Sequence, residues 1–141
     1  MYIPKYFTLS EFTNSTTAKK YGIDNTPTFT VVNNLSNLCR LVLDDARQKL
    51  GSPIVVTSGY RSVALNLKIG GVNKSQHLTG CAVDIQSRDN DRLFQILSEN
   101  PNIDQLLYEN NGRTRWLHVS ITQTGLNPRR YINGNYIVRE K

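Results

Sequence analysis

The sequence predicts a single α+β domain, in which a central and mainly antiparallel sheet is backed by helices. The length of 141 residues fits one ordinary domain. Helical patterns dominate the first half of the chain and strand patterns cluster in the second half, without a repeat or a flexible linker between them. We therefore expect residues 1–141 to form one domain, with a short helical arm at 1–30 and a core at 31–141.

Two short helices are predicted in the arm. Thr8 and Glu11 have the spacing of a capping box, so a helix should begin directly after Thr8, its N-cap. A second helix is predicted over 14–21, where Gly22 can end it in a left-handed conformation. Thr26 and Pro27 then begin a turn or an extended stretch.

The core is expected to contain three further helices. The longest runs from Asn34 to Leu50, and Gly51 ends it. Its apolar positions recur at helical spacing: Leu35, Leu38, Cys39, Val42, Ala46 and Leu50. A short helix is predicted over 62–68 and a longer one over 89–100, where four apolar residues again follow helical spacing.

The strands follow from short apolar runs bounded by turn residues. Residues 54–56 form a β-branched run and are expected to be a buried strand. Further strands are predicted over 81–85, 106–108 and 116–121. Asn133-Gly134 lies between two short apolar pairs, which is typical of a β-hairpin.

The net charge and the apolar content of the chain limit the classes of partner and of location that we expect. The formal net charge of +6 favours anionic partners, which include nucleic acid, anionic membranes and cell-wall polymers. The basic residues are scattered and no nucleic-acid-binding motif accompanies them, so we expect no nucleic-acid partner. No apolar run reaches the roughly 18 residues needed for a membrane span, and the start MYIPKYFTLSEF does not resemble an export signal. Cys39 and Cys81 are expected to be buried apolar residues.

The chain contains only 2 histidines, and a carboxylate follows the first of them. His77 lies in a loop before a tight turn and a strand that carries Asp84, and His118 interrupts an apolar strand. Two imidazoles and one carboxylate would suit Zn²⁺ and would leave a fourth position for water. Alternatively, both histidines are hydrogen-bonded residues at the edge of the core and Asp84 makes a cap or a surface pair.

The pattern Ser75-x-His77-x-x-Gly80-x-Ala82-x-Asp84 resembles the signature of the zinc D-Ala-D-Ala carboxypeptidases, peptidase family M15. This family includes bacteriophage endolysins and the dipeptidases of vancomycin resistance. Two flanking blocks, 57–62 with Asn66 and 116–120, resemble the family's blocks in the same order. The wider fold group includes lysostaphin-type peptidases and the amino-terminal domain of hedgehog proteins. By this resemblance His77, Asp84 and His118 are zinc ligands.

The resemblance departs from the family at the general base. Many members carry Glu or Asp three residues before the second ligand histidine, where this chain has Arg115, which cannot accept a proton. The carboxylates on the preceding strand are Asp104 and Glu109. A Glu at the end of that strand resembles the hedgehog and phage-type arrangement, so Glu109 is assigned the base role and Asp104 is the alternative. Glu109 could instead be a solvated hairpin residue paired with Arg113 or Arg115.

Two more residues are implied as substrate contacts. In the family the arginine matching Arg61 faces the metal and binds a carbonyl or carboxylate oxygen, which suits a forked cation. The alternative is a surface arginine after a turn. Ser75 is carried over as a secondary contact, although a hydroxyl before a turn often caps that turn.

The resemblance implies a zinc metallopeptidase that hydrolyses peptidoglycan stem peptides, as a D-alanyl carboxypeptidase or endopeptidase. The alternatives are an L-Ala-D-Glu endopeptidase endolysin and a non-catalytic zinc-containing binding or structural module. The expected partner is peptidoglycan and the expected state is a monomer. Without an export signal, we expect a protein made in the cytoplasm that acts on the wall as a phage, prophage or virion-associated lysin.

Overall fold

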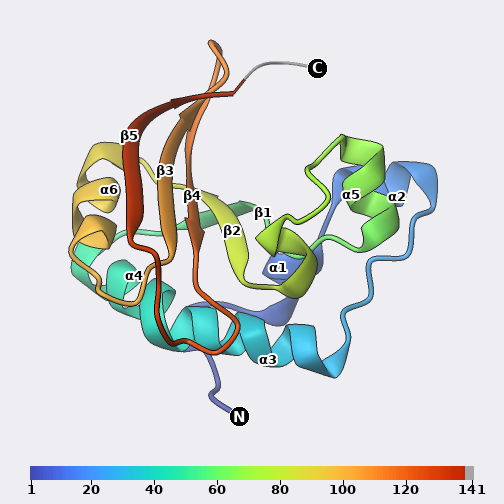
Figure 1. Ribbon diagram of the computed structural model, residues 1–141, viewed down its shortest axis with the longest axis horizontal. Helices are drawn as coiled ribbons and strands as arrows, with labels where there is room; N and C mark the ends of the chain where they lie inside the picture. Colours follow the sequence, from blue (N-terminus) through green and yellow to red (C-terminus); the bar gives the residue numbers. More distant parts are fainter. Residues whose placement is uncertain (139–141) are drawn as a thin grey trace.

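The computed structural model describes residues 1–138 and has a five-stranded sheet at its centre (Figure 1). The strands are β1 (Val55–Ser58), β2 (Ala82–Gln86), β3 (Gln105–Asn110), β4 (Arg115–Ser120) and β5 (Tyr131–Ile137). Their order across the sheet is β1-β2-β4-β3-β5, and every neighbouring pair is antiparallel except β3 and β5. The predicted single α+β domain with a mainly antiparallel sheet is confirmed.

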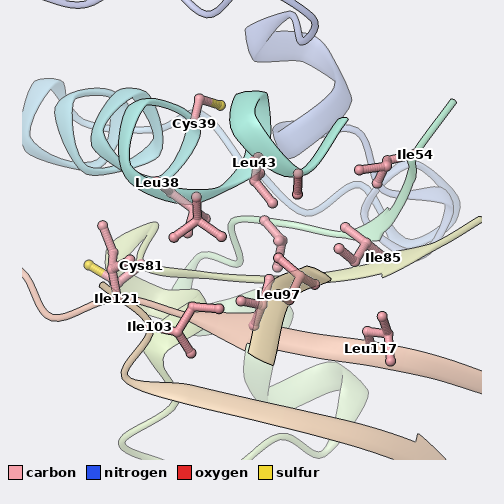
Figure 2. Close-up of a cluster of buried hydrophobic side chains, with 14 of the residues drawn as sticks. Leu38, Cys39, Leu43, Ile54, Cys81, Ile85, Leu97, Ile103, Leu117 and Ile121 are labelled. Carbon is pink, nitrogen blue, oxygen red and sulfur yellow. The ribbon is translucent and has the colours of Figure 1, made fainter. Parts of the chain in front are cut away.

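The two faces of the sheet have different roles. On one face, apolar side chains of β2, β3 and β4 pack against helices, and Figure 2 shows Ile85 and Leu117 in the same buried cluster as Leu38, Leu43 and Leu97. On the other face the same strands carry polar side chains. Because side chains alternate along a strand, burial of one face presents the polar set together on the other.

The longest helical run begins earlier than predicted. It comprises α3 (Phe29–Leu38), a π-helical segment (Cys39–Leu43) and α4 (Asp44–Leu50). Thr28 is the N-cap, and its hydroxyl accepts a hydrogen bond from the Val31 N–H at 3.3 Å. The start at Asn34 is therefore wrong, because capping chemistry rather than the apolar spacing determines where the run begins. Its end at Gly51 is confirmed.

The shorter helices lie near their predicted positions: α1 (Leu9–Thr13), α2 (Thr16–Tyr21), α5 (Val63–Ile69) and α6 (Asn90–Ser98). The side chains of Ser15, Ser62 and Asp89 cap the last three. The capping box at α1 is wrong. The Thr8 hydroxyl lies 3.2 Å from the Ser10 hydroxyl and makes no side-chain cap, so the helix starts with a backbone hydrogen bond alone.

Two strand predictions need correction. The run 54–56 was expected to be buried, but β1 lies at the edge of the sheet and Val55 is 57% exposed. The hairpin at Asn133-Gly134 is wrong, because both residues lie inside β5, which pairs in parallel with β3. The outer edge of β3 was open to a partner, and a strand that pairs along it satisfies more backbone groups than an isolated hairpin would.

The N-terminal segment packs on the core. Phe7 and Phe12 belong to the buried cluster, and the Tyr60 N–H donates a 2.7 Å hydrogen bond to the Phe12 carbonyl. Gly59 allows this approach, since a Cβ there would lie 2.3 Å from the Phe12 carbonyl oxygen. A side chain at this position would force α1 away from β1.

Gly59→Ala is therefore expected to lower the free energy of unfolding by about 1–3 kcal/mol, the usual cost of overpacking. Urea denaturation at neutral pH measures it. Gly134→Ala is the matched control, because its added Cβ would meet Phe94 at 3.6 Å, an ordinary contact. Equal unfolding midpoints for the two variants would contradict the close approach.

Candidate metal centre

The structure brings together the three residues singled out in the sequence. His77 lies in a single 3-10 turn (Gln76–Thr79), and Asp84 of β2 is directly opposite His118 of β4 in the sheet. One oxygen of Asp84, Oδ1, lies 3.4 Å from His77 Nε2 and 3.0 Å from His118 Nδ1. Each residue offers one ligand atom, and these atoms all lie within 4.8 Å of one another. This arrangement could hold a metal ion.

The orientation of His77 is set by its neighbours. Its Nδ1 lies 2.7 Å from the Gly59 carbonyl oxygen, an acceptor that places the ring proton on Nδ1. The lone pair of Nε2 then points toward Asp84. A histidine that donates one ring N–H to a carbonyl while its other nitrogen is free is the usual arrangement of a metal ligand. Gly59 was part of a motif block in the sequence, but its carbonyl gave no signal there.

The electrostatics of the cluster fit a cation. Burial acts to raise the pKa of Asp84, but the neighbouring His77 and His118 outweigh it and hold that pKa well below its usual range. Burial acts to lower the pKa of His118, but the hydrogen bond to Asp84 and its charge outweigh it, and the pKa is raised. A dication among an ionised carboxylate and two imidazoles would satisfy all three groups, and this donor set suits Zn²⁺.

Glu109 lies beside this cluster. Its Oε1 is 3.7 Å from His118 Nδ1, and its partner across the β3–β4 ladder is Trp116, whose side chain hydrogen-bonds to it. Burial and the charge of Asp84 raise the pKa of Glu109. A half-desolvated carboxylate with a raised pKa is suited to accept and return a proton.

Arg115 does not pair with Glu109. Its guanidinium lies over the Tyr108 ring, 3.9 Å from the ring centre. Tyr108 belongs to the core face of the sheet and Glu109 to the polar face, so the alternative of a Glu109–Arg115 pair is wrong. Arg115 therefore points away from the cluster.

Asp104 has a structural environment. It is 2% exposed, and its carboxylate accepts hydrogen bonds from the Arg129 guanidinium, from the Arg129 backbone N–H and from the Gln76 side chain. Burial acts to raise the pKa of Asp104, but these hydrogen bonds lower it below its ordinary value. The contacts do not support Asp104 as the base, because its lone pairs are already engaged.

Asp104→Asn is expected to lower the free energy of unfolding at pH 7 by about 1.5–3 kcal/mol, the size of hydrogen bonds to a charged group. Since the folded pKa lies below the unfolded one, this stabilisation is present above the unfolded pKa and is lost as the pH falls through the folded one. The difference between parent and variant should therefore shrink below about pH 4. Urea denaturation from pH 7 to pH 3 measures it, and a difference independent of pH would contradict the assignment.

Arg61 lies in the site rather than on the surface. Its side chain is 13% exposed, and its Nη2 is 3.7 Å from Asp84 Oδ2. Its Nε donates to the Ser58 hydroxyl at 3.2 Å, and its Nη1 donates to the side-chain amide oxygen of Asn66 at 3.3 Å. Burial lowers the pKa of Arg61, and Asp84 acts against this. Ser58 and Asn66 fix the guanidinium, a role that the motif blocks did not reveal.

Ser75 is placed at the same site with a capping contact. Its hydroxyl oxygen accepts a hydrogen bond from the His77 N–H at 3.2 Å, so it caps the turn that carries His77. Ser75 also lines the cleft in front of the cluster. The Ser75 hydroxyl can still donate its hydrogen to an acceptor of a ligand in the cleft.

The cluster opens into a cleft of about 590 Å³. Its lining includes His77, Asp84, His118, Glu109, Arg61, Ser75, Trp116, Ile69, Val72 and Tyr136. Tyr136 was missed as a site residue because the sequence placed it in a hairpin.

No helix within residues 1–138 has the length and apolar character needed to cross a bilayer.

Comparison with known proteins gives one family. Residues 5–120 match the model of the family described as Peptidase M15. A search of curated proteins gave no match. The matched segment contains α1 to β4 and every residue of the cluster, whereas β5 lies beyond it.

Proposed function

Since the chain belongs to peptidase family M15, we propose that it is a zinc metallopeptidase that hydrolyses the stem peptides of peptidoglycan. The observation that supports this most directly is the convergence of His77, Asp84 and His118 with Glu109 beside them, in one open cleft. A structural zinc site is closed by four protein ligands, whereas three ligands facing a cleft leave room for water and substrate.

The residues of the site divide the chemistry between them. The two imidazoles and Asp84 would hold the zinc ion, which would supply a Lewis acid and lower the pKa of a water molecule. Glu109 takes the proton of the attacking water and returns it to the leaving amine. Arg61 directs its guanidinium N–H groups toward a substrate carboxylate or toward the oxyanion that develops at the scissile carbonyl.

Arg61 also bears on the choice of bond. A substrate with a carboxylate near the scissile bond gains a charge-assisted hydrogen bond from it. Terminal D-Ala-D-Ala meets this condition, because its free carboxylate lies one residue from the bond. We favour D-alanyl carboxypeptidase or endopeptidase chemistry on this ground. The L-Ala-D-Glu bond is the alternative, because D-Glu carries its own α-carboxylate.

The experiment is a digest of purified peptidoglycan with the zinc-loaded protein, with products identified by mass. Release of D-alanine or of new D-alanyl ends supports the favoured bond. New amino groups on D-Glu with intact D-alanine ends would assign an L-Ala-D-Glu endopeptidase. A protein that binds zinc and leaves both bonds intact would be the non-catalytic module. The presence of Arg115, where many family members are expected to carry an acid, favours this alternative.

The setting in which the enzyme works is also a proposal. We propose a monomer that acts on the bacterial wall as a phage, prophage or virion-associated lysin. The net charge of +6 supports an encounter with a polyanionic wall by long-range attraction. Salt dependence of wall binding, stronger at low ionic strength, would test this attraction.

A further inference from the structure

A second hollow adjoins the cleft on the β5 side of the metal centre. It has a volume of about 490 Å³, and Glu109, His118, Ser75, Val72 and Tyr136 line both spaces, so the two are continuous. The hollow alone is lined by Lys74, Gln76, Gln105, Leu107, Arg129 and Tyr131. Arg61 lines the cleft and not the hollow. A substrate longer than a dipeptide would extend from the cleft into this space.

A β-bulge in β5 places Tyr136 in the wall of the hollow. Leu107 of β3 pairs with Asn133 of β5, and Glu109 of β3 pairs with Tyr136 of β5. Between these two pairs β3 advances by two residues and β5 by three, so β5 contains one extra residue. Without the extra residue, alternation would put Asn135 beside Glu109 and turn Tyr136 to the opposite face. The bulge thus sets Tyr136 on the same face as Tyr131 and next to the metal centre. Bulges that re-aim a side chain occur beside active sites.

The wall formed by β5 is anchored to the turn that carries His77. The Tyr131 N–H donates to the Asp104 carbonyl at 2.9 Å, and the Arg129 guanidinium binds the Asp104 carboxylate at 2.7 Å. The Gln76 side chain donates to the same carboxylate at 3.0 Å. Asp104 therefore joins both walls of the hollow, and a rigid wall lowers the entropy lost when a ligand binds.

The side chains that line the hollow indicate what kind of ligand fits it. The Tyr131 and Tyr136 side chains are 49% and 39% exposed and offer apolar ring faces with phenolic donors. Asp104 neutralises Arg129. Among residues 1–138 no acidic side chain pairs with Lys74, so this lysine is the available cation at the rim. Aromatic faces with one unpaired cation suit a peptide segment that carries a carboxylate.

We propose that this hollow binds an acidic segment of the substrate peptide, with Tyr136 against its backbone and Lys74 paired with its carboxylate. This proposal rests on the proposed function for the identity of the peptide. Under this proposal, β5 and the loop before His77 recognise the part of the substrate far from the scissile bond. Arg61 binds the part of the substrate that lies within the cleft.

Binding is measured by the change in fluorescence of Trp116, which is the only tryptophan of the chain and lines the cleft. The background is Glu109→Gln, so that ligands are bound and not cleaved. The probes are the stem pentapeptide L-Ala-γ-D-Glu-L-Lys-D-Ala-D-Ala, the same peptide with the D-Glu carboxylate amidated, and N-acetyl-D-Ala-D-Ala. Calorimetry repeats each titration independently of fluorescence.

Tyr136→Ala is expected to weaken pentapeptide binding about tenfold and to weaken dipeptide binding far less, because Tyr136 is shared by the cleft and the hollow. Lys74→Gln is expected to remove the preference for the free over the amidated pentapeptide, about tenfold. Lys19→Gln, a lysine of α2 that lines neither space, is the matched charge control and should change nothing.

Unchanged pentapeptide binding by Tyr136→Ala, or equal loss of both pentapeptides with Lys74→Gln, would overturn the assignment of the hollow. So would the absence of binding by any pentapeptide in both methods. The proposed function fails separately, if the parent enzyme leaves peptidoglycan intact. The titrations report occupancy without turnover, so the two failures are distinguishable.

Discussion

Replacing Glu109 by glutamine is expected to lower the rate of peptide hydrolysis by about two to four orders of magnitude, the usual contribution of a positioned base. The amide has nearly the same shape as the carboxylate but cannot take the proton of the attacking water. The fold and the bound metal should be retained, because Glu109 is not among the three clustered ligand residues. Hydrolysis of muropeptides, zinc content and circular dichroism measure the three quantities.

Asp104→Asn provides the comparison for this variant. Its carboxylate is engaged by Arg129 and Gln76, so its loss should cost stability and lower hydrolysis far less than Glu109→Gln does, at temperatures where the variant is folded. An inactive Asp104→Asn together with an active Glu109→Gln would reverse the assignment and place the base at the start of β3.

Replacing His118 by alanine is expected to weaken zinc binding by at least about 100-fold and to abolish hydrolysis. Loss of a residue that only orients a ligand already costs 10–100-fold in metal affinity, and His118 would itself be a ligand. The remaining set, His77 and Asp84, offers too few donors to hold the ion against a chelator. Elemental analysis after dialysis and competition with a chromogenic chelator measure the affinity.

Trp116→Phe is the control for this variant, because it changes a neighbouring side chain on the same strand face without removing a donor from the cluster. It should keep its zinc. If His118→Ala binds zinc as tightly as the parent protein, the His77–Asp84–His118 site is not where the ion binds, and the cluster would be a hydrogen-bonded feature of the core edge.

The sequence by itself determined several helix ends, two strands of the site, the fold class and the family. Helix ends at Gly22 and Gly51, the strands around Asp84 and His118, and the α+β class follow from periodicity and turn chemistry, which act over a few residues. The motif around His77 was sufficient to identify the family, because its spacing encodes a turn followed by a strand. These features need no knowledge of which distant segments meet.

Only the tertiary structure decided which groups are neighbours. The resemblance favoured Glu109 over Asp104 as the base, but only the structure shows that Asp104 is held by Arg129 while Glu109 lies 3.7 Å from His118. The Asn-Gly pair that is typical of a hairpin lies instead in a strand that extends the sheet beside β3 and brings Tyr136 to the site. Strand pairing depends on which sheet edges are open after the rest of the chain has packed, and that information is spread over contacts far apart in the sequence.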